Sequence, residues 1–240
     1  MTLIFIQARS TSIRFPGKSM AKIGAFPMIH WVLSACVSAG NSHNIVLCIP
    51  KRTSENMLKG YVKEFFPSIR IFEGEEHDVY QRFKDAYLEF KSDFEKEPPA
   101  NGLIRVCADR PLLSPVLLSK LLHTEKHVIE LLYNHETFKL KGPCGIGGES
   151  ISRSLSKKFF KVFDSNLIDS EHVTAQLYRN RISLCRMENS LCKLPFGKKV
   201  NYSVDTREDL RKTERIMRDF SLKPGDRLPA EQFLEFENFR

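Results

Sequence analysis

The sequence predicts an α/β fold, in which a mainly parallel sheet is covered by helices on both faces. Apolar stretches of strand length alternate with stretches of helical period through the first half of the chain. The same alternation returns near the C-terminus, after a less regular middle section. Strand–helix–strand order is typical of parallel sheets, because each helix carries the chain back to the edge where the next strand begins. The 240 residues are enough for one domain with a single substantial core.

Each element of the first half is supported by a local pattern. Residues 3–6 and 44–49 are short apolar runs of strand type, and residues 27–37 carry apolar side chains along one helical side that ends near Gly40. Further along, the pattern predicts a helix at 54–66, a strand at 69–72, a helix at 79–90, a charged surface loop at 91–102, a strand at 103–107 and a helix at 115–123. Ser114-Pro115 supplies the last of these helices with an N-cap and a first-turn proline.

The middle section, residues 133–199, is less regular and holds Gly142, Gly145, Gly147 and Gly148, and we interpret it as a small inserted lobe within a single domain of residues 1–240. Beyond it, Val200, Tyr202 and Val204 alternate as in a strand, and Thr206 is placed to cap a following helix. The lobe carries more apolar residues than a sheet-covering helix requires, and this surplus favours a homodimer formed through it.

Composition narrows the classes of partner. The net charge of +8 suits an anionic ligand. The cations are spread along the chain without a basic run interleaved with stacking aromatics, so we favour a nucleoside triphosphate and a carboxylate-bearing sugar over nucleic acid. No apolar run approaches the length of a membrane span and the chain does not open as a signal peptide, so we expect a cytoplasmic protein with no membrane partner. Six cysteines without a CxxC pair are expected to be reduced and structural.

The loop after the first strand carries the strongest chemical signal. It reads QARSTSIRFPGK over residues 7–18 and combines Arg9, Arg14 and Lys18 with three hydroxyls. In open α/β sheets, ligands bind at the carboxyl ends of the strands. Guanidinium groups grip phosphate oxygens in pairs and lysine adds a mobile point charge, so the loop predicts a polyphosphate site.

Two aspartates follow strands in the same way. Asp109 comes directly after the strand at 103–107, and Asp205 follows the alternating segment that ends at Val204. Because the carboxyl ends of parallel strands share one edge of the sheet, we expect the two carboxylates to meet over the loop. Hard oxygen ligands of this kind suit Mg²⁺ or Mn²⁺, whose coordination phosphate and water would complete. Each aspartate could instead be a turn or cap residue, with Thr206 competing for the cap beside Asp205.

These segments resemble the signatures of cytidylyltransferases that activate acidic sugars, of the acylneuraminate and CMP-Kdo synthetase type. The loop is similar to ARxxSxRxPGK, and most of all to the QARxxSTRLPGK form of the spore-coat-polysaccharide type. Residues 105–112 resemble RxxGDxPL, and residues 204–210 match VDTxEDL. Weaker matches are FxGxxxDVxxR at 72–82, PxGLxxE at 143–149 and EHVT at 171–174. The resemblance covers about residues 3–215 of the chain.

The resemblance implies a Rossmann-like three-layer sandwich of the nucleotide-diphospho-sugar transferase type, with a mainly parallel mixed sheet and a lobe at 133–199 for sugar binding and dimerisation. It implies Mg-dependent transfer of CMP from CTP to an acidic sugar in surface polysaccharide biosynthesis, with release of pyrophosphate. The implied catalytic residues are Arg9, Lys18, Asp109 and Asp205, the two aspartates also being the metal ligands. The implied nucleotide-binding residues are Gln7, Ala8, Arg9, Ser12, Arg14, Lys18, Arg82 and Arg105, and the implied sugar-binding residues are Glu149, Glu171 and His172.

The chain also departs from these signatures. Thr11 and Ala108 stand where the family has Gly, Arg110 stands where it has Cys, and Gly147-Gly148 replaces Asp-Val. A β-branched Thr11 narrows the allowed backbone dihedrals and could crowd a ligand. Two alternatives therefore stay open: the same fold acting on another nucleotide or acceptor, and a non-catalytic binding or assembly subunit.

Overall fold

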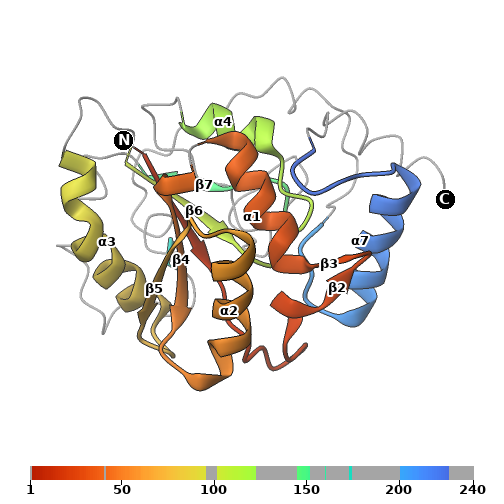
Figure 1. The fold of residues 1–240 in the computed structure, drawn as a ribbon, viewed down its shortest axis with the longest axis horizontal. Helices are drawn as coiled ribbons and strands as arrows, with labels where there is room; N and C mark the ends of the chain where they lie inside the picture. The colour runs from red at the N-terminus through yellow and green to blue at the C-terminus, as the bar shows by residue number, and fades with distance from the viewer. Residues whose placement is uncertain are drawn as a thin grey trace, which may run out of the picture.

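The computed structural model of the chain describes residues 2–40, 42–95, 102–122, 145–151, 160, 173–174 and 201–226. Its central element is a five-stranded sheet in the order β5-β4-β1-β6-β7 (Figure 1). The strands are β1 (Leu3–Gln7), β4 (Ile45–Pro50), β5 (Arg70–Gly74), β6 (Leu103–Cys107) and β7 (Glu149–Ile151). Neighbouring strands pair in parallel except for β7, which is antiparallel to β6. The predicted mainly parallel mixed sheet is confirmed.

Helices cover both faces of the sheet. On one face lie α1 (Met28–Ala39), α2 (Asn56–Phe65) and α4 (Pro115–Leu122), and on the other lies α3 (Val79–Glu95) (Figure 1). The alternation along β1 explains this arrangement, because Ile4 and Ile6 pack into the core beneath α1 whereas Leu3 and Phe5 pack into the core beneath α3. Strands that are apolar on both sides need cover on both sides, which gives the three-layer sandwich.

A third core joins the two ends of the chain. It lies beneath a short hairpin of β2 (Lys22–Ile23) and β3 (Phe26–Pro27) and beneath α7 (Arg207–Asp219) (Figure 1). Its buried residues are Phe15, Ile23, Met28, Trp31, Leu112, Leu117, Ile146, Tyr202, Val204, Ile216 and Met217. This core places the segment before α7 beside the loop that follows β1.

One predicted boundary and one predicted strand are wrong. Helix α3 continues to Glu95, although a loop was expected from residue 91, because the charged residues there are compatible with a helix and the first proline is Pro98. Residues 202–205 are not a strand. The apolar alternation arises because the side chains of Tyr202 and Val204 are both buried in the third core. Instead of a ladder of strand pairs, the Val204 N–H donates a single 2.8 Å hydrogen bond to the Asp109 carbonyl oxygen in the loop after β6.

Three short helices complete the described elements: η1 (Lys18–Met20), η2 (Ser42–Asn44) and η3 (Thr53–Glu55). No helix within the described ranges has the length and apolar character needed to cross a bilayer. Cys36 and Cys48 are buried free thiols, as expected for structural cysteines, and burial raises the pKa of both. Most of the lobe at 133–199 lies outside the described residues, so the lobe and the homodimer stay predictions.

Candidate active site

The loop of residues 8–17, here called the phosphate loop, leaves the sheet at the carboxyl end of β1. It closes on itself through a 2.8 Å hydrogen bond from the Gly17 N–H to the Ser10 carbonyl oxygen. Gly17 has a φ of +70°, a conformation that side chains disfavour, which explains a glycine at this position. Phe15 is buried in the third core, whereas Ile13 is almost fully exposed. The loop is therefore anchored on one side and open at its tip.

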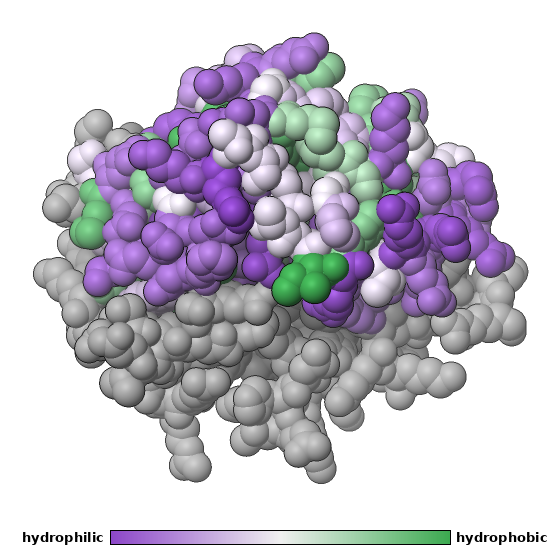
Figure 2. All heavy atoms as spheres, turned by 90° about the horizontal axis from the view of Figure 1, so that it is seen from below, coloured by the Kyte–Doolittle hydropathy of each residue, from purple (hydrophilic) through white to green (hydrophobic). Residues whose placement is uncertain are grey.

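This edge of the sheet faces downward in Figure 1, where the phosphate loop runs. Seen from that side, the surface of the described residues is mostly hydrophilic (Figure 2). Such a surface suits a charged ligand better than an apolar one.

Lys18, the first residue of η1, lies at the centre of the predicted site. Its Nζ donates to Asp109 Oδ2 at 2.8 Å, to the Val204 carbonyl oxygen at 3.0 Å and to Asp205 Oδ1 at 3.2 Å. An ammonium group has three N–H donors, and all three are thereby used. The two carboxylates lie no farther apart than the sum of their distances to Nζ, well within the roughly 8 Å that a hydrated ion could bridge. The predicted meeting of Asp109 and Asp205 is therefore observed.

Charge pairing in this cluster outweighs the cost of burial. Desolvation alone would raise the pKa of the Asp109 carboxyl, but the Lys18 ammonium holds that pKa below its ordinary value. Desolvation alone would lower the pKa of Lys18, but Asp109 and then Asp205 raise it. Both groups are therefore charged throughout the neutral range.

Asp205 does not cap the following helix. Thr206 is the N-cap of α7, and its Oγ1 accepts from the Asp209 N–H at 3.2 Å while Asp209 Oδ2 accepts from the Thr206 N–H at 2.8 Å. The Asp205 carboxylate instead accepts from Lys18 and, at 3.0 Å, from Arg14 Nη2. Since the cap is supplied by its neighbour, Asp205 is available for chemistry.

Arg82, predicted to contact the nucleotide, is fully buried at the start of α3. Its Nη1 donates to the Glu75 carbonyl oxygen at 2.6 Å, whereas Nε and Nη2 are buried with no hydrogen-bond partner among the residues that the structure describes. Burial lowers the pKa of Arg82, and the nearby charge of Arg9 acts in the same direction. Buried donors of this kind are satisfied when an acceptor enters the site.

Arg105 and Glu149, predicted to bind nucleotide and sugar, are paired with each other. Arg105 Nη1 donates to Glu149 Oε2 at 2.7 Å, and both side chains are at most 4% exposed. Thr174 Oγ1 donates to the same carboxylate oxygen at 2.8 Å. Arg105 Nη2 donates to Gln7 Oε1 at 2.9 Å. Because a guanidinium group has donors only, Gln7 must turn its oxygen toward Arg105 and its Nε2 away. This pair orients Gln7, and direct ligand contacts of Arg105 or Glu149 stay predictions.

The remaining predicted residues occupy less informative positions. Ala8, the first residue of the phosphate loop, is buried and its N–H donates to the Cys48 carbonyl oxygen at 3.2 Å, and Ser12 is also buried. Glu171 and His172 lie outside the described residues.

Two of the departures from the family signatures contact each other. Arg110 is 4% exposed, and its Nη1 donates to the Gly147 carbonyl oxygen at 2.8 Å. At Gly148 an added Cβ would lie 3.0 Å from the Arg105 carbonyl oxygen, so the glycine pair lets the chain pass close to β6. The departures therefore form a local packing arrangement directly beside Asp109, and the charge of Arg110 acts with that of Lys18 to lower the pKa of the Asp109 carboxyl.

Sequence reasoning missed two groups, Glu55 and the Val204 carbonyl. Glu55 is fully buried and accepts two hydrogen bonds from Ser10. An acidic residue at the start of a helix is ordinarily explained by the helix dipole, so its sequence position carries no distinct signal. A backbone carbonyl leaves no mark in the sequence at all.

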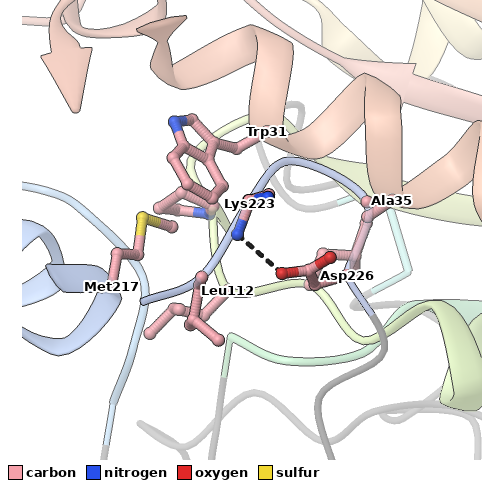
Figure 3. Close-up of a pocket in the computed structure, with 10 residues that line it drawn as sticks. Trp31, Ala35, Leu112, Met217, Lys223 and Asp226 are labelled. Atoms are coloured by element: carbon pink, nitrogen blue, oxygen red, sulfur yellow. Dashed lines mark hydrogen bonds between the residues drawn. The ribbon is translucent and has the colours of Figure 1, made fainter. Parts of the chain in front are cut away.

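The described residues contain no group of three or more His, Cys, Asp or Glu side chains that could hold a metal ion. The oxygens that converge here are two carboxylates and one backbone carbonyl. A separate small pocket lies between α1, the loop after β6 and the turn at 221–226, with Trp31, Leu112 and Met217 in its wall (Figure 3). None of the predicted site residues lines that pocket.

The family model described as Cytidylyltransferase matches residues 3–222. The spore coat polysaccharide biosynthesis protein SpsF of Bacillus subtilis is 25% identical over 228 residues, 92% of this chain and 88% of that protein. A 3-deoxy-manno-octulosonate cytidylyltransferase of Vibrio parahaemolyticus is 25% identical over 115 residues, 48% of this chain and 42% of that protein. A solved structure of a cytidylyltransferase from Leptospira borgpetersenii is similar with a TM-score of 0.76 at 19% identity, over 99% of this chain and 93% of that one.

Proposed function

The chain belongs to the cytidylyltransferase family, and from this premise we propose that it transfers CMP from CTP to a hydroxyl of an acidic sugar. Pyrophosphate is the second product, and the pathway is the synthesis of a surface polysaccharide. The names of two relatives support this substrate class, since one refers to spore coat polysaccharide biosynthesis and the other to an acidic sugar. The observation that carries the proposal is the convergence of Asp109 and Asp205 on Lys18 beside the phosphate loop.

A divalent cation, Mg²⁺ or Mn²⁺, fits the oxygens around the Lys18 ammonium. Asp109, Asp205 and the Val204 carbonyl supply hard oxygen ligands around one position, as these ions prefer. Two carboxylates this close repel each other unless a cation lies between them, and Lys18 fulfils that requirement in the observed arrangement. When bound, the ion would polarise the α-phosphate and lower the pKa of the attacking hydroxyl.

The reaction forms a bond from the sugar hydroxyl oxygen to the α-phosphorus of CTP. It breaks the bond from that phosphorus to the oxygen that bridges to the β-phosphate, and this oxygen leaves with pyrophosphate. The hydroxyl proton passes to solvent. Arg9, Arg14 and Lys18 hold the triphosphate and neutralise the charge that grows on the leaving group, because phosphoryl chemistry of this kind depends mainly on position and charge. To contact the phosphates, the Lys18 ammonium must first give up its hydrogen bonds to Asp109 and Asp205.

Gln7 and Arg82 supply directed donors to the nucleotide. Gln7 turns its Nε2 away from Arg105, and Arg82 has two buried nitrogens without a partner among the described residues. Both sets of donors match acceptor atoms, which cytosine, ribose and phosphate all offer. Arg105 acts through Gln7 in this scheme.

The acceptor sugar binds toward the lobe at 133–199 in this proposal. Glu149 is the member of the sugar set within the described residues, and Glu171 and His172 complete it. The second copy of a homodimer packs through the same lobe, whose surplus of apolar residues supports that assembly. The enzyme acts in the cytoplasm, where CTP is made available to it.

The test is a turnover assay with purified protein, CTP, Mg²⁺ and a panel of acidic sugars. We expect pyrophosphate release together with a CMP-sugar, identified by mass, and little product with ATP, GTP or UTP. Asp109→Asn serves as the inactive control. Pyrophosphate release with another nucleoside triphosphate in preference to CTP would assign the fold to a different substrate, and no turnover with any sugar would favour a non-catalytic subunit.

A further inference from the structure

Glu55 is a buried carboxylate that the reaction scheme does not use. It ends η3, directly before α2, and its side chain is fully buried. Oε1 accepts a hydrogen bond from the Ser10 backbone N–H, and Oε2 accepts one from the Ser10 hydroxyl, both at 2.8 Å. Both carboxylate oxygens are thus bound to a single residue of the phosphate loop.

Ser10 is the residue at which the phosphate loop closes. Its carbonyl oxygen accepts the 2.8 Å hydrogen bond from the Gly17 N–H. Arg9 directly precedes Ser10, and Lys18 directly follows Gly17. A contact that fixes Ser10 therefore fixes the backbone next to two of the three cations assigned to the triphosphate.

A fully buried carboxylate beside a loop that binds polyanions lowers stability and weakens ligand binding unless other contacts compensate for it. Burial of an ionised group is costly without hydrogen bonds, and a negative charge here would repel phosphate. Two features compensate for the burial of Glu55. It accepts two hydrogen bonds, which are strengthened by its charge, and its charge favours the charged form of the buried Arg82.

We propose that Glu55 is a positioning residue for the CTP site. It holds Ser10 so that the backbone that carries Arg9 and Lys18 already has its closed conformation when the triphosphate arrives. This inference rests on the proposed function for its effect on turnover, but its effect on the loop does not depend on any substrate. Without the carboxylate, the backbone at Ser10 and Gly17 opens more often, and nucleotide binding must first restore the closed loop.

Glu55→Gln and Glu55→Ala separate hydrogen bonding from packing. Glutamine can accept from the Ser10 N–H through Oε1 and donate through Nε2 to the Ser10 hydroxyl, which can act as an acceptor. Alanine removes both contacts. Leu58→Ala is the matched control, because Leu58 is a fully buried residue of α2 that packs in the core beneath α1 and α2. It should lower stability without touching the loop.

The first measurement is amide hydrogen exchange of residues 9–18 in the free protein. We expect faster exchange at Ser10 and Gly17 in Glu55→Ala, rates near wild type in Glu55→Gln, and no change at these amides in Leu58→Ala. Unchanged exchange in Glu55→Ala would overturn the inference, and so would equal acceleration in Leu58→Ala. If Glu55→Ala does not fold, Ser10→Ala removes only the hydroxyl contact and should give a smaller acceleration at the same amides.

The second measurement is steady-state turnover with CTP. Glu55→Ala should lower kcat/KM by about 10–100-fold, mainly through a higher KM for CTP, since small misplacements of binding groups have effects of this size. Glu55→Gln should restore most of that loss, and Leu58→Ala should leave the KM for CTP unchanged. Wild-type kinetics in Glu55→Ala would refute the inference. Lack of turnover in the wild type would instead refute the proposed function, and the exchange experiment would still decide the role of Glu55.

Discussion

Asp109 and Asp205 accept hydrogen bonds from the same nitrogen, Nζ of Lys18, at 2.8 and 3.2 Å. Asp109 follows β6 and Asp205 directly precedes the N-cap of α7, and the 2.8 Å hydrogen bond from the Val204 N–H to the Asp109 carbonyl oxygen holds the two segments side by side. The cation between them belongs to the protein. In the proposed mechanism, a metal ion bound by the same oxygens would have to displace the Lys18 ammonium, which would then be available to contact phosphate.

Replacement of Lys18 by methionine should strengthen metal binding in the absence of nucleotide. The ammonium no longer competes for the oxygens, and the two carboxylates are left without a cation. We expect Mn²⁺ to bind about tenfold more tightly, equivalent to about 1.4 kcal/mol, as measured by electron paramagnetic resonance of free Mn²⁺. Lys18→Arg keeps a cation and is the control. Equal affinities in wild type and Lys18→Met would show that Lys18 and the metal ion do not share this position.

Removal of the cations Arg9 and Lys18 should impair turnover, and Lys18→Ala should also lower stability because it leaves the Asp109 and Asp205 carboxylates without their cation. Arg9→Ala and Lys18→Ala each remove a charge placed for the triphosphate, and we expect a loss on the order of 2–4 kcal/mol of transition-state stabilisation, as for one preorganised donor. Arg215→Ala is the matched control, because Arg215 is an exposed cation of α7 that pairs only with Asp219 among the ion pairs described. Full activity in both loop variants would contradict the assignment of the phosphate loop.

Stability should depend on pH through the Lys18–Asp109 pair. The folded-state pKa of Asp109 lies below its ordinary value of 3.8, so its contribution is complete above that pH and is lost as the pH falls through the folded pKa. The folded-state pKa of Lys18 lies above 10.5, so its contribution is complete below that pH and is lost as the pH rises through the folded pKa. Urea unfolding across pH should show both losses.

Asp109→Asn is the control for this pH dependence. It should reduce the acid-side loss, because the carboxyl that titrates is no longer there, and it should also abolish turnover. An acid limb as steep in Asp109→Asn as in the wild type would mean that other carboxyls dominate acid unfolding.

Gln7→Glu should keep the contact of this side chain with Arg105 and remove its amide donor. Glutamate keeps an acceptor for the Arg105 guanidinium, so the fold should be retained, but it lacks the Nε2 donor that faces away from Arg105. We expect the KM for CTP to rise about tenfold, or about 1.4 kcal/mol, in steady-state assays. The melting temperature should not fall. An unchanged KM would exclude Gln7 as a ligand-binding donor.

The homodimer prediction is tested by light scattering of the purified chain. We expect the mass of a dimer at micromolar concentration, because an apolar surplus in the lobe at 133–199 needs cover. A mass of one chain at that concentration would remove the dimer from the proposal.

The fold could be predicted because its strands are short apolar runs separated by helices. In the first strand, four successive apolar residues indicate that both faces of the sheet are covered, and all four are buried: Leu3, Ile4, Phe5 and Ile6. The position of Asp109 at the carboxyl edge of the sheet could be predicted because it follows a strand. Asp205 follows no strand, and it reaches the same place because Tyr202 and Val204 pack in the third core. The position of Lys18 between the two aspartates could not be predicted, because charge alone does not say whether a lysine faces a phosphate or a carboxylate. The burial of Glu55 and the pairing of Arg105 with Glu149 depend on tertiary contacts that no local pattern records.

The third oxygen near Lys18 belongs to the backbone of Val204, whose side chain is fully buried in the core between the phosphate loop and α7. Any residue at this position would present the same carbonyl, so an alanine scan of polar residues would never reveal this acceptor of the Lys18 hydrogen bond. What places the oxygen is the packing of an isopropyl group on the other side of the chain. The packing of the Val204 side chain in the interior therefore also sets the position of a hydrogen-bond acceptor of Lys18, so a substitution that shifts this side chain would shift the Lys18 ammonium although it changes no charged group.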